Sequence, residues 1–96
     1  VVGLTRSLAL ALGGDKIRVN VVCPGLADTP MKVGFTGRSG DPAEAAANEA
    51  KLIANVPMGR LVQAGEIADA ALWLASDEAS FVTGVALPVD GGFTAR

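Results

Sequence analysis

Two short apolar segments that lie far apart in the chain constrain its fold most strongly. Residues 17–23 are rich in β-branched side chains, and in residues 85–89 valine and leucine alternate with Ala86 and Pro88. Both segments are typical of β-strands, and Pro88 favours an edge strand or the end of a strand. Because helical segments separate the two strands, we expect them to run parallel. Two parallel strands are too few for a stable sheet, so we expect further strands from outside these 96 residues.

The sequence before the first strand has the pattern of an amphipathic helix. A leucine recurs every four residues over residues 1–12, which gives one apolar face. Gly13 and Gly14 are expected to end this helix, because glycine tolerates the left-handed conformation found after many helices. The chain begins with Val1 and shows no N-cap signal there, so we expect the helix, and the polypeptide, to start further upstream.

Two more helices are predicted between the strands, giving the order helix, strand, loop with helix, helix, strand. Residues 26–40 contain several glycines and a proline and are expected to form a loop. Asp41 can cap a helix whose first position is Pro42 and which runs to about residue 54. A third helix is predicted over residues 65–75.

Composition excludes several classes of protein. Hydrophobic residues make up 50% of the 96 and the net charge is −2, which argues against disorder and against a basic nucleic-acid-binding surface. The apolar runs are too short to cross a membrane. The chain has no histidine, which excludes Cys–His zinc sites, and we expect no metal site. Its one cysteine, Cys23, cannot form an internal disulfide, which favours a reducing compartment such as the cytoplasm.

Several short motifs follow one another along almost the whole chain. In order they are Leu4-Thr5-Arg6-Ser7-Leu8-Ala9, Ile17-Arg18-Val19-Asn20-Val21-Val22-Cys23-Pro24-Gly25, Thr29-Pro30-Met31, Pro57-Met58-Gly59-Arg60, Glu66-Ile67-Ala68, Leu74-Ala75-Ser76-Asp77, Thr83-Gly84 and Val89-Asp90-Gly91-Gly92. Together their order and spacing resemble the last third of the short-chain dehydrogenase/reductase family. The resemblance implies an α/β fold in which residues 1–96 are the C-terminal part of one Rossmann-type domain, a doubly wound parallel sheet.

The resemblance also implies an activity for the complete protein. Such enzymes transfer hydride between the nicotinamide of NAD or NADP, which this sequence does not distinguish, and an alcohol or ketone carbon of a small molecule. The family's glycine-rich cofactor loop and its catalytic Ser, Tyr and Lys are expected before Val1, so no catalytic residue is assigned here. The 96 residues alone are expected to be inactive. In its full-length form the protein is expected to be a homo-oligomer, a tetramer.

By resemblance, this chain supplies the nicotinamide side of the active site and a lid over the substrate. The expected cofactor-binding residues follow the first strand and are Pro24, Gly25, Ala27 and Thr29. The backbone at Ala27 and the hydroxyl of Thr29 are expected to contact the nicotinamide carboxamide. Residues 30–56 resemble the substrate loop and lid helix, with candidate apolar contacts at Met31, Val33 and Phe35.

Each of these residues also has a plainer interpretation. Pro24 and Gly25 form a strand-ending turn in many proteins, Thr29 can act as a loop cap, and Phe35 can anchor a loop. Four other features have simple structural explanations, namely Cys23 as a small buried hydrophobic residue, Trp73 in a core or subunit interface, Arg60 as a surface ion-pair partner, and Asp90-Gly91-Gly92 as a structural turn near a subunit boundary.

Two other functions stay open beside the enzyme. The first is a truncated, noncatalytic chain that mediates only subunit association through residues 65–75 and 85–89. The second is an unrelated small binding module, which would have to fold alone as a monomer.

An isolated chain of residues 1–96 is predicted to aggregate or to remain molten, because its apolar strand would have an open edge. Denaturant unfolding followed by circular dichroism and by tryptophan fluorescence checks this prediction. A soluble monomer that unfolds in one cooperative transition would contradict it.

Overall fold

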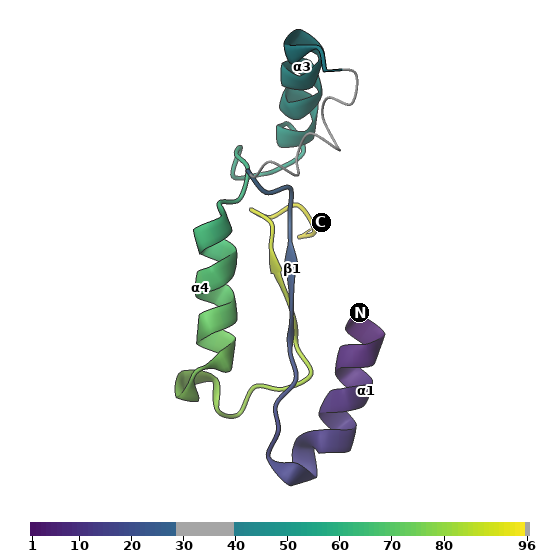
Figure 1. Ribbon diagram of the computed structural model, residues 1–96, viewed down its shortest axis with the longest axis vertical. Coiled ribbons are helices and arrows are strands. Elements are labelled where there is room, and N and C mark those ends of the chain that lie inside the picture. The colour runs from purple at the N-terminus through teal and green to yellow at the C-terminus, as the bar shows by residue number, and fades with distance from the viewer. Residues whose placement is uncertain (29–39, 96) are drawn as a thin grey trace.

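The computed structural model describes residues 1–28 and 40–95. Its elements follow the predicted order (Figure 1), and they are helix α1 (Val2–Leu12), the short 3-10 helix η1 (Gly13–Asp15), strand β1 (Val21–Pro24), helix α3 (Pro42–Ile53), helix α4 (Ala64–Ala75), the short 3-10 helix η3 (Asp77–Ala79) and strand β2 (Ala86–Val89). The structure therefore confirms the predicted order of helices and strands.

Strands β1 and β2 pair in parallel, as predicted, with Val21 opposite Ala86 and Pro24 opposite Val89. At the two ends of the pairing, the N–H of Val21 donates to the carbonyl of Val85, and the N–H of Gly25 donates to the carbonyl of Val89. Alternate residues of a strand face the same neighbour, so the ring nitrogen of Pro88 faces away from β1. The proline is thus compatible with a paired strand because its missing N–H lies on the other edge.

The first strand is shorter than predicted, since residues 17–20 are not part of it. The side chain of Asn20 occupies the place of ladder bonds, donating to the carbonyl of Val82 at 3.0 Å and accepting from the N–H of Val85 at 3.0 Å. The N–H of Val19 donates to the hydroxyl of Thr83. The β-branched pattern extends through these residues, where side-chain bonds accompany a backbone bond from the N–H of Gly84 to the carbonyl of Val19 at 2.7 Å.

Helix α1 ends at Leu12, just before Gly13 and Gly14, as predicted, but neither glycine takes the expected left-handed conformation. Gly13 has a right-handed backbone, and the left-handed residue is Lys16, with φ of 61°. The 3-10 helix η1 follows α1 directly, so the left-handed residue that changes the chain direction comes after η1, at Lys16. There the N–H of Lys16 bonds to the carbonyl of Gly13 and the N–H of Ile17 to that of Leu12, the two bonds of a Schellman motif.

The two later helices begin close to where the sequence indicates. The carboxylate of Asp41 accepts a hydrogen bond from the N–H of Ala43 at 3.0 Å, and Pro42 occupies the first position of α3. Helix α4 begins at Ala64, one residue before the predicted start, and Glu66 lies in its first turn. None of the helices in the described ranges is long and apolar enough to cross a membrane.

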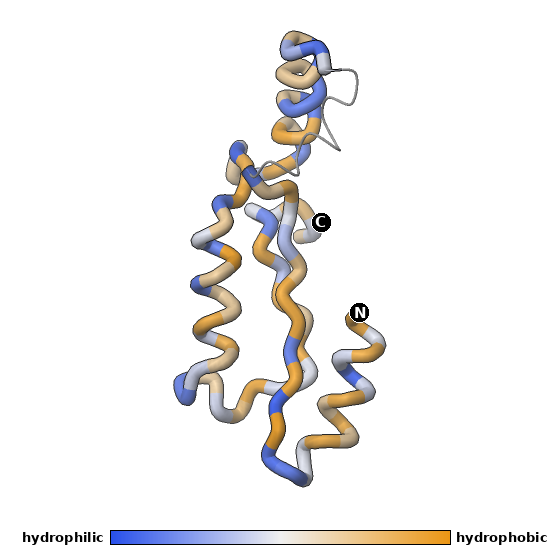
Figure 2. The backbone as a smooth tube through the Cα atoms, viewed as in Figure 1, coloured by the Kyte–Doolittle hydropathy of each residue, from blue (hydrophilic) through white to orange (hydrophobic). Residues whose placement is uncertain are grey.

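The described chain covers only part of its apolar surface. Helices α4 and α1 lie on opposite sides of the strand pair, and α3 stands apart from both (Figure 1). The buried apolar residues are Ala9, Leu61, Val62, Leu74 and Ala79. Helices α1 and α4 contain many hydrophobic residues (Figure 2), and several of these side chains are exposed. Trp73 is 44% exposed, so it is not a core residue of this chain. The accessible surface is 6591 Å², compared with about 5,100 Å² for a compact chain of this mass.

One arginine joins the start of the sheet to the end of α4. The guanidinium of Arg18 donates to the carbonyls of Leu74 at 2.6 Å, Ser76 at 3.1 Å and Val82 at 3.2 Å. The last carbonyls of a helix lack partners within it, and they carry partial negative charge that favours a cation. Arg18 therefore fixes the position of α4 relative to the strands.

The substitution Arg18→Met should lower the free energy of unfolding by about 2–3 kcal/mol, because it removes charge-assisted bonds and leaves half-buried carbonyls without their donor. Urea denaturation of the full-length protein measures this loss. Arg6→Met, at an exposed position of α1, is the matched control and should change the stability little. Equal stability of the two variants would contradict the role given to Arg18.

Candidate functional site

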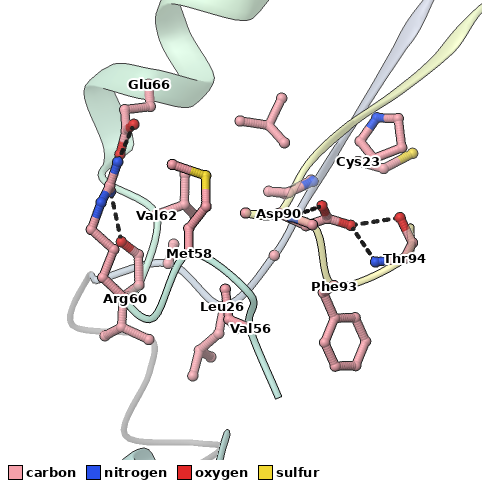
Figure 3. Close-up of a pocket in the computed structure, with 18 of the residues that line it drawn as sticks. Cys23, Leu26, Val56, Met58, Arg60, Val62, Glu66, Asp90, Phe93 and Thr94 are labelled. Atoms are coloured by element: carbon pink, nitrogen blue, oxygen red, sulfur yellow. Dashed lines mark hydrogen bonds and ion pairs between the residues drawn. The ribbon is translucent and has the colours of Figure 1, made fainter. Parts of the chain in front are cut away.

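The carboxyl ends of β1 and β2 open into a hollow of about 1030 Å³. Its wall is formed by residues 23–27 after and within β1, by side chains from residues 52–66, and by residues 88–94 at the end of β2. Figure 3 shows these three segments converging from different parts of the chain. In open parallel sheets, ligands bind beyond the carboxyl ends of the strands, so this hollow is the candidate functional site.

The two strand ends are held against each other at Gly25. A Cβ added to Gly25 would lie 3.0 Å from the Cα of Asp90, so only glycine fits without displacing the backbone. The Asp90 carboxylate accepts hydrogen bonds from the Thr94 hydroxyl at 2.7 Å and from the N–H groups of Gly92 and Thr94 (Figure 3). These bonds, the Thr94 hydroxyl first, lower the pKa of Asp90. Asp90 is therefore an ionised structural carboxylate that closes the turn.

The same turn receives the segment that follows α3. The N–H of Met58 donates to the carbonyl of Gly91 at 3.0 Å. Gly91 has φ of +63°, and a Cβ there would lie 2.8 Å from a methyl carbon of Val56. The backbone of Gly91 thus provides the surface on which the end of the expected lid segment rests.

A second contact fixes the backbone that follows β1. Ala27 and Val62 form an isolated parallel bridge. The N–H of Asp28 donates to the carbonyl of Val62 at 2.9 Å, and the N–H of Val62 donates to the carbonyl of Leu26 at 3.1 Å. Backbone groups of successive extended residues point to opposite sides, so the N–H and C=O of Ala27 face away from Val62. Within residues 1–28 and 40–95, neither group of Ala27 has a hydrogen-bond partner.

An ion pair lies directly beside this bridge. Arg60 donates to both carboxylate oxygens of Glu66, at 2.7 and 3.0 Å, and also to the carbonyl of Leu61. Glu66 accepts in addition from the N–H of Gln63 at 3.0 Å. The hydrogen bonds from Arg60 and then from Gln63 lower the pKa of Glu66 from 4.5 to about 2, so the pair stays charged at neutral pH. The same partner raises the pKa of Arg60.

The structure brings together three of the predicted site residues. Pro24, Gly25 and Ala27 all line the hollow. The other predicted residues, Thr29, Met31, Val33 and Phe35, lie outside the described residues. Of the predicted lid over residues 30–56, the described part is residues 40–56, which includes α3.

Other predictions about single residues have mixed outcomes. Cys23 is half-buried and lines the hollow, so it is less enclosed than predicted. Asp90-Gly91-Gly92 does form a turn at the end of the sheet, as predicted. Arg60 is an ion-pair partner at the surface, which confirms the plainer interpretation. Residues 1–28 and 40–95 contain no group of three His, Cys, Asp or Glu side chains placed to hold a metal ion.

Sequence reasoning missed that the turn at Asp90 and the segment around Val62 belong to this site. A signal for Asp90 was present, because two parallel strands end at the same edge and residues after each must meet there. No comparable signal marked Val62, which reaches Ala27 through a single isolated bridge.

Known proteins resemble this chain over almost its full length. The family described as Enoyl-(Acyl carrier protein) reductase matches residues 1–94. The cis-4-hydroxycyclohexanecarboxylate dehydrogenase of Sinomonas cyclohexanicum is 48% identical over 99% of this chain, which corresponds to 34% of that protein. The chain thus spans about a third of the length of this curated relative.

Solved structures agree with the sequence matches. A short chain dehydrogenase family protein from Francisella tularensis is 35% identical, with a TM-score of 0.85, over 99% of this chain and 40% of its own. A structure from Agrobacterium tumefaciens, described as a 2-deoxy-d-gluconate 3-dehydrogenase with bound NADP, is 34% identical, with a TM-score of 0.85, over 99% of this chain and 36% of its own. The sheet pairing, the site at its carboxyl edge and these matches together show that the chain belongs to the short-chain dehydrogenase/reductase family.

Proposed function

We propose that this chain forms the nicotinamide side of the active site in an NAD(P)-dependent oxidoreductase. One observation carries the proposal. Ala27 lies just beyond the carboxyl end of β1, lines the hollow, and has an N–H and a C=O that face away from the bridge to Val62. A backbone donor and acceptor fixed side by side at this edge are suited to a planar amide ligand.

The residues present fit the carboxamide of a nicotinamide ring. A primary carboxamide carries an NH₂ donor and a C=O acceptor, so it can bond to the C=O and N–H of Ala27 together. The hydroxyl of Thr29, two residues further along, is proposed as a third partner. When bound, the nicotinamide supplies the hydride chemistry. Ala27 and Thr29 orient the ring, and the hollow excludes water from one side of it.

This chain is not proposed to supply the catalytic acid or base. By the family resemblance those groups belong to a Ser, a Tyr and a Lys that precede Val1. The relative from Sinomonas is named for a hydroxy acid substrate and the Agrobacterium structure for a sugar acid. We accordingly propose a small alcohol or ketone as the substrate, covered by the lid over residues 30–56, with Met31, Val33 and Phe35 as contacts. NAD and NADP are both compatible with the residues present.

The substitution Thr29→Val should weaken binding of the preferred nicotinamide cofactor by about fivefold in the full-length enzyme. This corresponds to the loss of one hydrogen bond, about 1 kcal/mol. The dissociation constant and the rate of hydride transfer check the expectation.

Thr29→Ser keeps the hydroxyl and is the matched control, so it should bind the cofactor like the unaltered enzyme. Unchanged affinity and rate in Thr29→Val would overturn the role of Thr29. Failure of the unaltered enzyme to bind NADH and NADPH would overturn the proposed function.

The exposed apolar residues favour a second proposal about assembly. Leu72 on α4 is 70% exposed, and Phe81 after η3 is fully exposed. We propose that the enzyme is a cytoplasmic homo-oligomer, a tetramer, that covers α4 and β2 at subunit contacts. The alternative noncatalytic chain would use the same surface to join full-length subunits.

The intact mass of the native protein distinguishes these two proposals. The enzyme should have a subunit of about 25–30 kDa, within the ordinary range for one domain. A native chain of 9.6 kDa would favour the noncatalytic alternative and would contradict the proposed enzyme.

A further inference from the structure

The Arg60–Glu66 ion pair lies at the protein surface, beside the bridge between Ala27 and Val62. Both side chains are about half exposed, 51% and 41%, so solvent screens their attraction and the pair adds little to overall stability. Yet the planar guanidinium of Arg60 donates one hydrogen bond to each carboxylate oxygen of Glu66, which fixes the geometry of the pair. Such a pair restrains the local backbone more than it stabilises the whole fold.

The bonds of the pair all converge on one short segment, residues 60–63. Arg60 holds the carbonyl of Leu61, and Glu66 holds the N–H of Gln63 from the first turn of α4. Val62 lies between these two anchored residues and is 9% exposed. The segment is thus fixed on both sides of Val62 to the N-terminus of a helix.

Val62 in turn fixes the backbone on either side of Ala27. Its carbonyl accepts from the N–H of Asp28, and its N–H donates to the carbonyl of Leu26. A second link, from the amide of Gln63 to the carboxylate of Asp28 at 3.4 Å, joins the same two segments. The orientation of the N–H and C=O of Ala27, which face away from Val62, therefore depends on where residues 60–63 are held.

We infer that Arg60 and Glu66 are positioning residues for nicotinamide binding, which they control by holding Val62 against the backbone at Ala27. This inference rests on the proposed function, because it assigns the nicotinamide carboxamide to Ala27. Neither side chain is a catalytic residue, since each acts through the segment 60–63.

The first test compares two ligands that differ only in the nicotinamide half. Glu66→Gln and Arg60→Met should weaken binding of NADH roughly three- to fivefold, the size of effect that an exposed pair can supply. Binding of ADP-ribose, which lacks the nicotinamide, should not change. NADPH and 2′-phospho-ADP-ribose replace these probes where the enzyme prefers NADP.

Arg60→Lys keeps the positive charge but cannot make the two parallel hydrogen bonds of a planar guanidinium. Its affinity for NADH should therefore lie between those of Arg60→Met and the unaltered enzyme. Glu78→Gln, which removes an exposed acid near the other end of α4, is the matched control and should bind both ligands normally.

The second test measures hydrogen exchange of the full-length enzyme without any cofactor. The amides of Asp28 and Val62, the two donors of the bridge, should exchange faster in Glu66→Gln and Arg60→Met than in Glu78→Gln. The amide of Val21, in the β1–β2 pairing, should keep its exchange rate, because the change is local.

Three results would overturn the inference. Unchanged NADH affinity in both variants would show that the pair does not position the site. An equal loss of NADH and ADP-ribose binding, or faster exchange at Val21, would show a general structural effect. If the unaltered enzyme binds ADP-ribose and NADH equally well, the nicotinamide site at Ala27 is itself wrong, and the proposed function fails independently of the variants.

Discussion

The parallel pairing of β1 with β2 is the constraint on which the rest of the structure depends. Parallel strands end at the same edge of a sheet, so the pairing brings Gly25 against Asp90 although the two residues are far apart in the chain. Helix α4 crosses from the end of one strand toward the start of the other. The hollow at the carboxyl edge of the sheet is therefore a direct result of strand direction. The segments that follow β1 and β2 form two of its sides.

Polar side chains fix one end of this pair and glycines fix the other. Before the strands, Arg18 and Asn20 bond to backbone groups of residues 74–85, so the register is set where the chain enters the sheet. After the strands, Gly25 allows its backbone to approach the backbone of Asp90, and Gly91 leaves room for the side chains of Val56 and Met58. The bonds at the entrance and the close contact at the exit fix the strand end from which the backbone continues to Ala27.

The sequence predicted those features that depend on periodicity and on single-residue geometry. Strand direction, the Asp41 cap and the order of the elements all follow from such local patterns. It did not predict where Asn20 interrupts the ladder or why Lys16 takes the left-handed position, because both depend on bonds to specific carbonyls. The pair of Arg60 with Glu66 crosses from a loop into a helix, so the rule of i and i+4 spacing on a helix does not detect it.

A binding site formed by backbone N–H and C=O groups responds to substitutions differently from a site formed by side chains. The N–H and C=O of Ala27 that face away from Val62 do not depend on the alanine side chain. Their direction depends instead on Val62, and the position of Val62 depends on Arg60 and Glu66. Binding at such a site therefore depends on the residues that determine where the backbone lies.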